Sequence, residues 1–224
     1  MITLGNNEIG KAYIGGTEID KMYLGNELVF SNAPEVLPYD AEIEYIGSNS
    51  SASGVYQYIE TNITPQLTYQ IHIRISPLTT YPVTNSSLFL TSWSGRRFFI
   101  QIGSANTNKV YWHGMNPSSY IELASSGVND IVCGNGFITV NGTTYTGNNY
   151  LQNTTDTIKI FNTSNSRRAV FNLYLFEITN NGQLIACFKP VRVGTEGCLY
   201  ETKSKQLFHN AGTGAFTLGN DITT

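Results

Sequence analysis

The chain has 224 residues, of which only 13% are charged, and its formal net charge of −3 comes with a pI near 5.6. Binding to a phosphate backbone needs a dense basic face, so this balance excludes nucleic acid as an expected partner. No apolar run reaches the roughly 18 residues of a membrane span, and the N-terminus lacks the basic and apolar parts of a secretory signal. We therefore expect a protein made in a cytosol without membrane insertion. With 14 Tyr and 11 Phe among abundant Asn, Thr, Ser and Gly, the composition favours strands and turns over helices.

The first thirty residues contain an internal repeat. Residues 9–15 are echoed ten positions later by residues 19–25, and an even period keeps equivalent side chains on one face of a strand. The pairs Gly15-Gly16 and Gly25-Asn26 predict the turns of a small β-meander. Two or three short strands bury little apolar surface. Residues 1–30 are therefore predicted to be an attachment segment that packs against another subunit, the main domain or a docking protein. The alternative is that these residues form the first sheet of a single domain. The predicted anchor or oligomer interface consists of Ile9, Lys11, Tyr13, Ile14, Ile19, Lys21, Tyr23 and Leu24.

Residues 31–39 contain two prolines and little periodicity, which predicts a linker, and the main domain is expected over residues 40–224. There, short alternating or aromatic runs stand between clusters of turn residues, a pattern typical of a sandwich or barrel. The predicted strands are 41–46, 56–63, 69–75, 87–91, 97–102, 109–113, 131–132, 137–140, 157–161, 171–177, 184–190, 197–200 and 207–208.

Two hairpins are predicted from their turns. Asn135-Gly136 and Asn141-Gly142 bracket the strand 137–140, and Asn180-Asn181-Gly182 joins residues 171–178 to 184–188. Asn and Gly tolerate the positive φ that such tight turns need. No segment has the spacing of an amphipathic helix, so we expect little helix.

Several segments in the second half follow a recognisable order. A hairpin over residues 171–188 precedes Lys189-Pro190, Gly197-Cys198-Leu199-Tyr200, and the terminus Asn210-Ala-Gly212-Thr-Gly214-Ala-Phe216. Together with residues 42–46 and 57–63, they resemble the laminin-G-like, concanavalin-A-like sandwich domains common in phage and prophage virion proteins. The resemblance spans about residues 41–219, without a motif match over 79–156. Glu201 stands where family members often carry Asp. Gly212 and Gly214 are predicted to let the last strand approach the sheet closely.

The N-terminal Lys-x-Tyr-apolar-Gly pattern also resembles short segments that begin many phage tail, baseplate and head-fibre proteins. That resemblance implies attachment to the particle. The sequence therefore predicts an all-β protein, an antiparallel β-sandwich of the jelly-roll, concanavalin-A/laminin-G-like type behind a small β-meander. The resemblance implies a structural component of the virion, a head fibre, capsid decoration or tail appendage, with a homo-oligomer, trimer favoured, as its state. A receptor-binding lectin of the tail or baseplate is the alternative.

The best candidate for ligand binding is the central stretch that holds both tryptophans. Aromatic rings stack on the C–H surface of a sugar, and neighbouring polar groups fix its hydroxyls. Host-surface or mucosal glycans are the expected ligands. Because alternate strand residues belong to the core, a mixture of core and rim positions is the competing interpretation. The predicted glycan-binding residues are Trp93, Arg96, Arg97, Tyr111, Trp112 and His113.

Little in the sequence predicts catalysis or a bound metal. The histidines and cysteines lack metal-ligand spacing, and an odd number of cysteines argues against a disulfide framework. We therefore predict no catalytic residues, no cofactor and no resident metal, with the cysteines as small buried hydrophobes. The histidines are His72, His113 and His209, and the cysteines are Cys133, Cys187 and Cys198.

Carboxylates give two minor alternatives. Calcium needs clustered oxygen ligands, and Asp130, Asp156 and Asp221 are isolated in sequence, so a calcium site requires that they meet in space. Glu42 and Glu44 share a strand face, as paired carboxylates of sandwich glycosidases do, but they lack a third acidic residue. A glycan-degrading enzyme is therefore the less favoured function.

Overall fold

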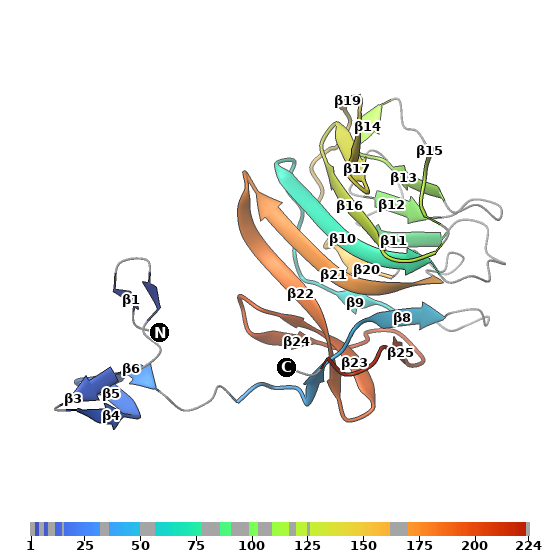
Figure 1. Ribbon diagram of the computed structural model, residues 1–224. Coiled ribbons are helices and arrows are strands. Elements are labelled where there is room, and N and C mark those ends of the chain that lie inside the picture. Colours follow the sequence, from blue (N-terminus) through green and yellow to red (C-terminus); the bar gives the residue numbers. More distant parts are fainter. Residues whose placement is uncertain are drawn as a thin grey trace. The chain divides into compact units, whose positions relative to one another are not determined.

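The computed structural model divides the chain into two compact units, Met1–Leu37 and Pro38–Thr224, each of which is described by itself (Figure 1). The protein is all-β, with 57% strand and no helix among the residues described. None of those residues belongs to a helix long and apolar enough to cross a membrane. The described residues are 3–4, 7–8, 12–14, 16–31, 36–49, 57–77, 86–90, 99–102, 109–116, 120–124, 126–161 and 170–222.

The first unit contains three separate two-stranded hairpins instead of one continuous meander. The turns predicted at Gly15-Gly16 and Gly25-Asn26 are confirmed, with Gly16 at φ +84° and Gly25 at φ +64°. The second copy of the repeat is divided by a bend at Asp20, so its residues fall on two strands. The pairs are β1 (Thr3–Leu4) with β2 (Asn7–Glu8), β3 (Ala12–Ile14) with β4 (Thr17–Ile19), and β5 (Lys21–Leu24) with β6 (Glu27–Ser31).

The second unit is built on a large antiparallel sheet in the order β18-β17-β16-β10-β21-β22-β23-β24. Three short strands extend it, since β8 pairs with β21 and β25, and β7 pairs with β22. The strands are β7 (Ala41–Glu42), β8 (Ile46–Asn49), β10 (Tyr69–Pro77), β16 (Asn129–Gly134), β17 (Phe137–Val140), β18 (Thr143–Thr146), β21 (Val170–Asn180), β22 (Gln183–Val193), β23 (Glu196–Glu201), β24 (Gln206–Phe208) and β25 (Thr217–Leu218).

A smaller antiparallel sheet forms the second layer, in the order β15-β13-β12-β11-β20-β9. In Figure 1 its strands lie behind the large sheet. A further pair, β14 (Met115–Asn116) with β19 (Asn148–Asn149), stands beside them. The strands of the smaller sheet are β9 (Ile59–Glu60), β11 (Ser86–Leu90), β12 (Phe99–Ile102), β13 (Lys109–Trp112), β15 (Tyr120–Glu122) and β20 (Lys159–Ile160).

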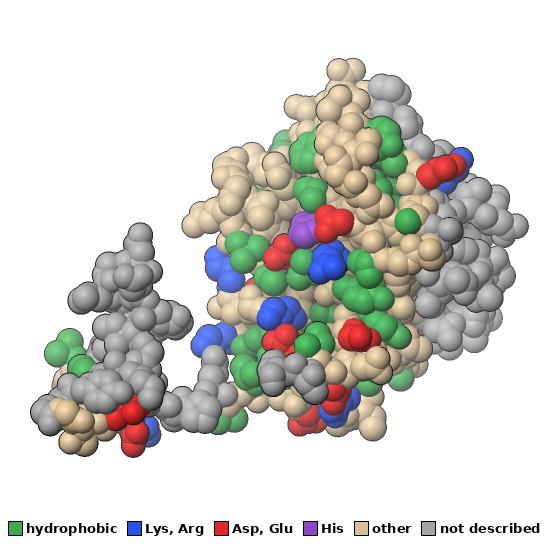
Figure 2. All heavy atoms as spheres, viewed as in Figure 1, with side chains coloured by type: hydrophobic (Ala, Val, Ile, Leu, Met, Phe, Trp, Pro, Cys, Tyr) green, Lys and Arg blue, Asp and Glu red, His purple; other side chains and the backbone are tan. Residues whose placement is uncertain are grey.

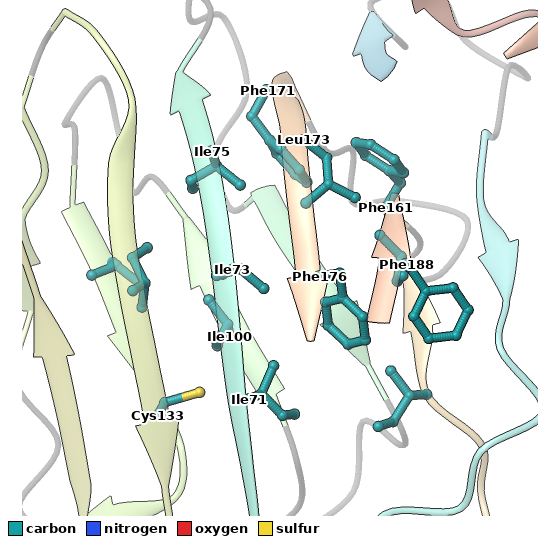
Figure 3. Packing of buried hydrophobic residues seen from close by; sticks show 14 of the residues in the cluster. Ile71, Ile73, Ile75, Ile100, Cys133, Phe161, Phe171, Leu173, Phe176 and Phe188 are labelled. Atoms are coloured by element: carbon teal, nitrogen blue, oxygen red, sulfur yellow. The ribbon is translucent and has the colours of Figure 1, made fainter. Parts of the chain in front are cut away.

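The core lies between the two sheets and follows from strand alternation. On β10, Ile71, Ile73 and Ile75 are fully buried, while the residues between them face outward. Figure 3 shows these isoleucines pointing into the same space as Phe176 of β21 and Ile100 of β12. Side chains from both layers thus form one hydrophobic cluster, which makes the unit a β-sandwich.

The hairpins predicted from Asn-Gly turns are confirmed. β17 pairs with β16 and β18 on its two sides, and β21 pairs with β22. Asn141 and Asn181 have φ of 47° and 49°, each followed by a glycine at positive φ. These consecutive left-handed residues match the twist of the flanking strands.

Glu201 closes the turn between β23 and β24. Its Oε1 accepts hydrogen bonds from the backbone N–H groups of Cys187 (2.9 Å) and Lys203 (3.1 Å), and its Oε2 accepts one from Ser204 N–H (2.6 Å). Burial raises the pKa of Glu201, but the hydrogen bonds from Ser204, Cys187 and Lys203 outweigh this effect and hold its pKa below the ordinary value of 4.5. Glu201 thus makes the carboxylate-to-backbone turn that an Asp would otherwise make.

The C-terminal Asn-x-Gly-Thr-Gly segment is organised by Asn210. Its Oδ1 accepts a hydrogen bond from Gly212 N–H (2.9 Å), and its Nδ2 donates one to Gly214 O (2.7 Å), with Gly214 at φ +82°. A close approach of the last strand is seen at Gly197, where a Cβ would lie 2.5 Å from Leu218 Cδ2. The terminal glycines therefore shape the turn, and the tight packing occurs on β23.

Replacement of Ile73 by Ala is expected to lower the free energy of unfolding by about 2–5 kcal/mol, because it leaves a cavity between the sheets. The same change at Ile222, which is 47% exposed, is the matched control and is expected to cost less than about 1 kcal/mol. Urea denaturation of both variants measures the difference. Equal losses would contradict the placement of Ile73 in the core.

Replacement of Glu201 by Gln is expected to cost about 1–3 kcal/mol at neutral pH, because a charged acceptor of three backbone hydrogen bonds is lost. A carboxyl group whose folded pKa lies below its unfolded value stabilises the fold above the unfolded value and loses this contribution as the pH falls through the folded value. The wild-type chain should therefore lose part of its stability below about pH 4.5, and the variant should lose less. Parallel acid dependences in unfolding experiments would argue against this role for Glu201.

Candidate ligand-binding groove

A β-bulge on β21 aims Tyr174 at the outer face of the large sheet. In the register between β10 and β21, Arg74 pairs with Leu175 and Ile75 pairs with Leu173, so Tyr174 is the extra residue. Leu173 and Phe176 are both buried although they are three positions apart, so the inward face shifts by one residue at the bulge. Tyr174 and Leu175 consequently lie together on the outward side, both half-buried.

At the same place β22 separates from β21. The pairing of the two strands ends at Phe176 and Phe188, and beyond it β21 pairs with β8. The chain between β7 and β8 follows the separated strand, since Ile43 N–H donates to Pro190 O at 3.1 Å. A depression forms where the two strands diverge.

This depression is a groove of about 430 Å³, near the lower end of the roughly 300–1,000 Å³ typical of ligand pockets. It combines half-exposed apolar groups with both signs of charge. Figure 2, drawn from the side of β10, β21 and β22, shows acidic, basic and apolar side chains mixed on this face. The residues that line the groove are Glu42, Ile43, Glu44, Arg74, Val128, Tyr174, Leu175, Lys189, Pro190 and Ile222.

The charged groups of the groove have defined positions. Glu42 forms an ion pair with Lys189 (3.3 Å) and accepts a hydrogen bond from Tyr39 OH (3.2 Å). Glu44 accepts a hydrogen bond from the side-chain amide of Asn220 (3.1 Å). Arg74 is half-exposed, and its nearest ion-pair partner, Asp130, is 3.9 Å away. The two glutamates do share one face, as the sequence predicted, and both are held by neighbouring donors.

Next to the groove, a polar row crosses the strands β16, β10, β21 and β22. His72 lies opposite Glu177, which lies opposite Cys187. His72 Nδ1 is 2.8 Å from Glu177 Oε2, and His72 Nε2 is 3.1 Å from Asp130 Oδ1. Burial, followed by the charge of Glu177, raises the pKa of the Cys187 thiol to about 11, so it is not a thiolate nucleophile at neutral pH. The row thus links four strands across this face of the sheet.

A second polar cluster lies at the other end of the sheet, on β23 and just after β24. Leu199 pairs with Phe208, so Cys198 and His209 are the next opposed positions, and Glu196 shares the face of Cys198. His209 Nδ1 is 3.4 Å from Cys198 Sγ and 3.2 Å from Glu196 Oε1. Burial, and then the charge of Glu196, raises the pKa of Cys198 to about 12. Among the described residues, this is the one group of three His, Cys, Asp or Glu side chains whose donor atoms all lie within 4.8 Å of one another.

The predicted glycan-binding stretch is only partly brought together. Trp93, Arg96 and Arg97 lie outside the described residues. Trp112 is fully buried and donates its indole N–H to Gly134 O at 2.8 Å, so its ring offers no face to a sugar, and its inclusion in a binding surface was wrong. Strand alternation explains this outcome, because β13 turns Trp112 inward and its neighbours outward.

Tyr111 and His113 flank Trp112 and are both half-buried, with ring centroids 4.4 Å apart. They lie on the side of the smaller sheet that faces away from the core. Tyr111 and His113 thus form a second aromatic surface, separate from the groove on the large sheet, whose lining does not include them.

The anchor residues fall on the small hairpins of the first unit. Ile9 and Lys11 lie outside the described residues, and the side chains of Tyr13 and Ile14 are not described. Ile19 is half-buried, and Lys21 is exposed. The rest of β5 is exposed as well: Met22, Tyr23 and Leu24 are 37%, 55% and 75% accessible.

The aspartates considered for calcium have other partners. Asp130 contacts His72, and Asp221 pairs with Arg192 at 2.7 Å. Asp156 does not belong to a group of three possible metal ligands within the described part of the chain. The all-oxygen group that calcium prefers is not found among these three residues.

No protein-family model matches the chain, and no curated protein matches it.

Proposed function

We propose that the chain is a structural component of a bacteriophage particle that attaches through its N-terminal unit and binds surface glycans through its sandwich. The observation that carries the proposal is the groove formed by the bulge of β21 and the divergence of β22. The phage assignment is supported by the resemblance of residues 41–219 and of the N-terminal repeat to virion proteins. A homo-oligomer, with a trimer favoured, fits a narrow attachment unit of this kind.

The groove suits a carbohydrate because sugars present both apolar and hydroxyl surfaces. Tyr174 supplies a ring, and its hydroxyl lies 3.3 Å from Ser76 Oγ, which fixes its orientation. Its ring also contacts that of Tyr45, with centroids 5.4 Å apart. Carboxylates accept hydrogen bonds from hydroxyls, and Arg74 and Lys189 donate to them. An aromatic platform between charged donors and acceptors is what glycan recognition requires.

The first unit suits attachment because it has little core of its own. Two-stranded hairpins are marginal alone, and a 37-residue unit buries too little surface to be stable without a partner. Met22, Tyr23 and Leu24 are exposed next to one another on β5. We propose that another virion protein, or a second copy of this unit, covers them.

Two related functions use the same surfaces. A receptor-binding lectin of the tail or baseplate would share the groove and differ only in its place on the particle. A glycan-degrading enzyme is favoured by one observation, that Glu42 and Glu44 both line the groove. Their contacts with Lys189 and Asn220 fit hydrogen bonding to a ligand better than proton transfer, so binding is the preferred function.

Replacement of Tyr174 by Ala is expected to weaken glycan binding by about tenfold or more, because the stacking platform of the groove is lost. Tyr145→Ala is the matched control, since Tyr145 is 39% exposed on β18 and does not line the groove. A glycan array followed by titration calorimetry measures both variants, with melting temperatures confirming that they fold.

Other outcomes of that experiment decide between the alternatives. Absence of binding by the intact chain would contradict the proposal. Binding that survives Tyr174→Ala but is lost in Tyr111→Ala would move the site to the smaller sheet. Release of reducing ends that disappears in Glu42→Gln or Glu44→Gln would establish the enzyme.

Deletion of residues 1–31 is expected to abolish incorporation into the particle while the remaining sandwich still binds glycan. The double change Tyr23→Ser with Leu24→Ser should reduce incorporation in the same direction, because it removes the exposed apolar surface. Val36→Ser, which removes a 94% exposed apolar side chain outside the predicted anchor residues, is the control and should incorporate normally. Quantification of the protein in purified particles tests these expectations, and normal incorporation of the truncated chain would exclude the attachment role.

A further inference from the structure

We propose that Glu196, Cys198 and His209 form a zinc-binding site at the edge of the large sheet, independent of the groove. The site would bind the metal through Cys198 Sγ, His209 Nδ1 and a carboxylate oxygen of Glu196. Its donor atoms already lie within 4.8 Å of one another.

The local fold brings these residues together by strand geometry. Cys198 on β23 faces His209, the residue that follows β24, because the register Leu199 with Phe208 continues by one position. Glu196 is two residues before Cys198, and residues two apart on a strand share a face. Glu201 holds the turn between β23 and β24 through hydrogen bonds from Lys203 and Ser204 N–H. The register that places Cys198 opposite His209 therefore does not depend on a bound metal.

Two of the three distances between donors match a tetrahedral zinc site. With Zn–S near 2.3 Å and Zn–N near 2.0–2.1 Å, tetrahedral angles place S and N about 3.5 Å apart, and N and O about 3.3 Å apart. The corresponding distances in the structure are 3.4 Å from Cys198 Sγ to His209 Nδ1, and 3.2 Å from His209 Nδ1 to Glu196 Oε1. The sulfur of Cys198 and the carboxylate of Glu196 lie within 4.8 Å of each other, so side-chain rotation has to direct the three donors at one centre.

The donor set selects the kind of metal. A thiolate, an imidazole and a carboxylate together suit zinc, whereas calcium and magnesium prefer oxygen ligands alone. Cys198 is buried beside Val191 and Tyr200, which cover the sulfur on one side, while His209 and Glu196 are half-exposed on the other. The metal would therefore enter from the solvent side, and a water or a group of a partner protein would complete the fourth position. On binding, the thiol releases its proton to solvent.

The test uses the full chain in reduced form and zinc chloride as the probe. Titration calorimetry and equilibrium dialysis should show one zinc ion per chain. Cobalt(II) in place of zinc should give a near-ultraviolet sulfur-to-metal charge-transfer band, which reports the bond to a thiolate. Cys198→Ser and His209→Gln should each weaken zinc binding by more than about 100-fold, because loss of a residue that only hydrogen-bonds to a metal ligand already costs about 10–100-fold.

Cys187→Ser is the matched control, since Cys187 is another buried thiol on the outer face of the same sheet, and it should bind zinc as the wild type does. Melting curves without metal establish that each variant folds. No stoichiometric uptake by the wild type would overturn the proposal and leave the cluster as a hydrogen-bonded trio. Unchanged zinc affinity in Cys198→Ser and His209→Gln would overturn it equally, because the metal would then be held elsewhere.

Discussion

The pairing of β10 with β21 is the constraint on which the rest of the sandwich depends. Along this register Ile71, Ile73 and Ile75 face the core, so the outward face of both strands is determined at the same time. The single extra residue at Tyr174 reverses the alternation halfway along β21. Because of that bulge, Tyr174 and Leu175 both face outward, and both line the groove. The architecture that stabilises the protein and the feature proposed to bind ligand are therefore set by one strand pair.

The outer face of the large sheet carries two chemically different regions. Near β10 and β21 are a groove with a tyrosine and paired charges and a row in which His72 stands between two carboxylates. At the far edge, β23 and the residue after β24 present sulfur, nitrogen and oxygen donors within a short distance. The first region suits a hydroxyl-rich ligand and the second suits a cation. In the functions proposed above, the first region binds the ligand and the second stabilises the edge strand.

The sequence was informative about strands and turns because these depend on local chemistry. Asn141 and Asn181 identified their hairpins, since the positive φ of such turns restricts the residue type. Which face of a strand points to the core was harder to predict. Trp112 lies within an aromatic run in which every residue looks equally suited to a surface, and only the register of β13 shows that it faces the core.

The features missed by sequence reasoning depend on pairing across strands. Asn172 and Glu177 both face outward although they are five positions apart, and this odd spacing of polar residues was a signal of the bulge. Cys198 and His209 are eleven residues apart and show no metal motif, because their proximity comes from the hairpin between β23 and β24. The small size of the first unit predicted that its anchor residues would be exposed. The bend at Asp20, which divides the second copy of the repeat between two strands, could not be predicted.

Chemical-shift mapping on the full chain tests most directly whether the outer face of the large sheet is the recognition surface. Backbone amide resonances would be recorded during titration with host-surface polysaccharide. The account predicts the largest shifts at Glu44, Arg74, Tyr174 and Leu175, with small shifts on β13 and β18. Shifts concentrated around Tyr111 and His113, or no shifts at saturating polysaccharide, would contradict it.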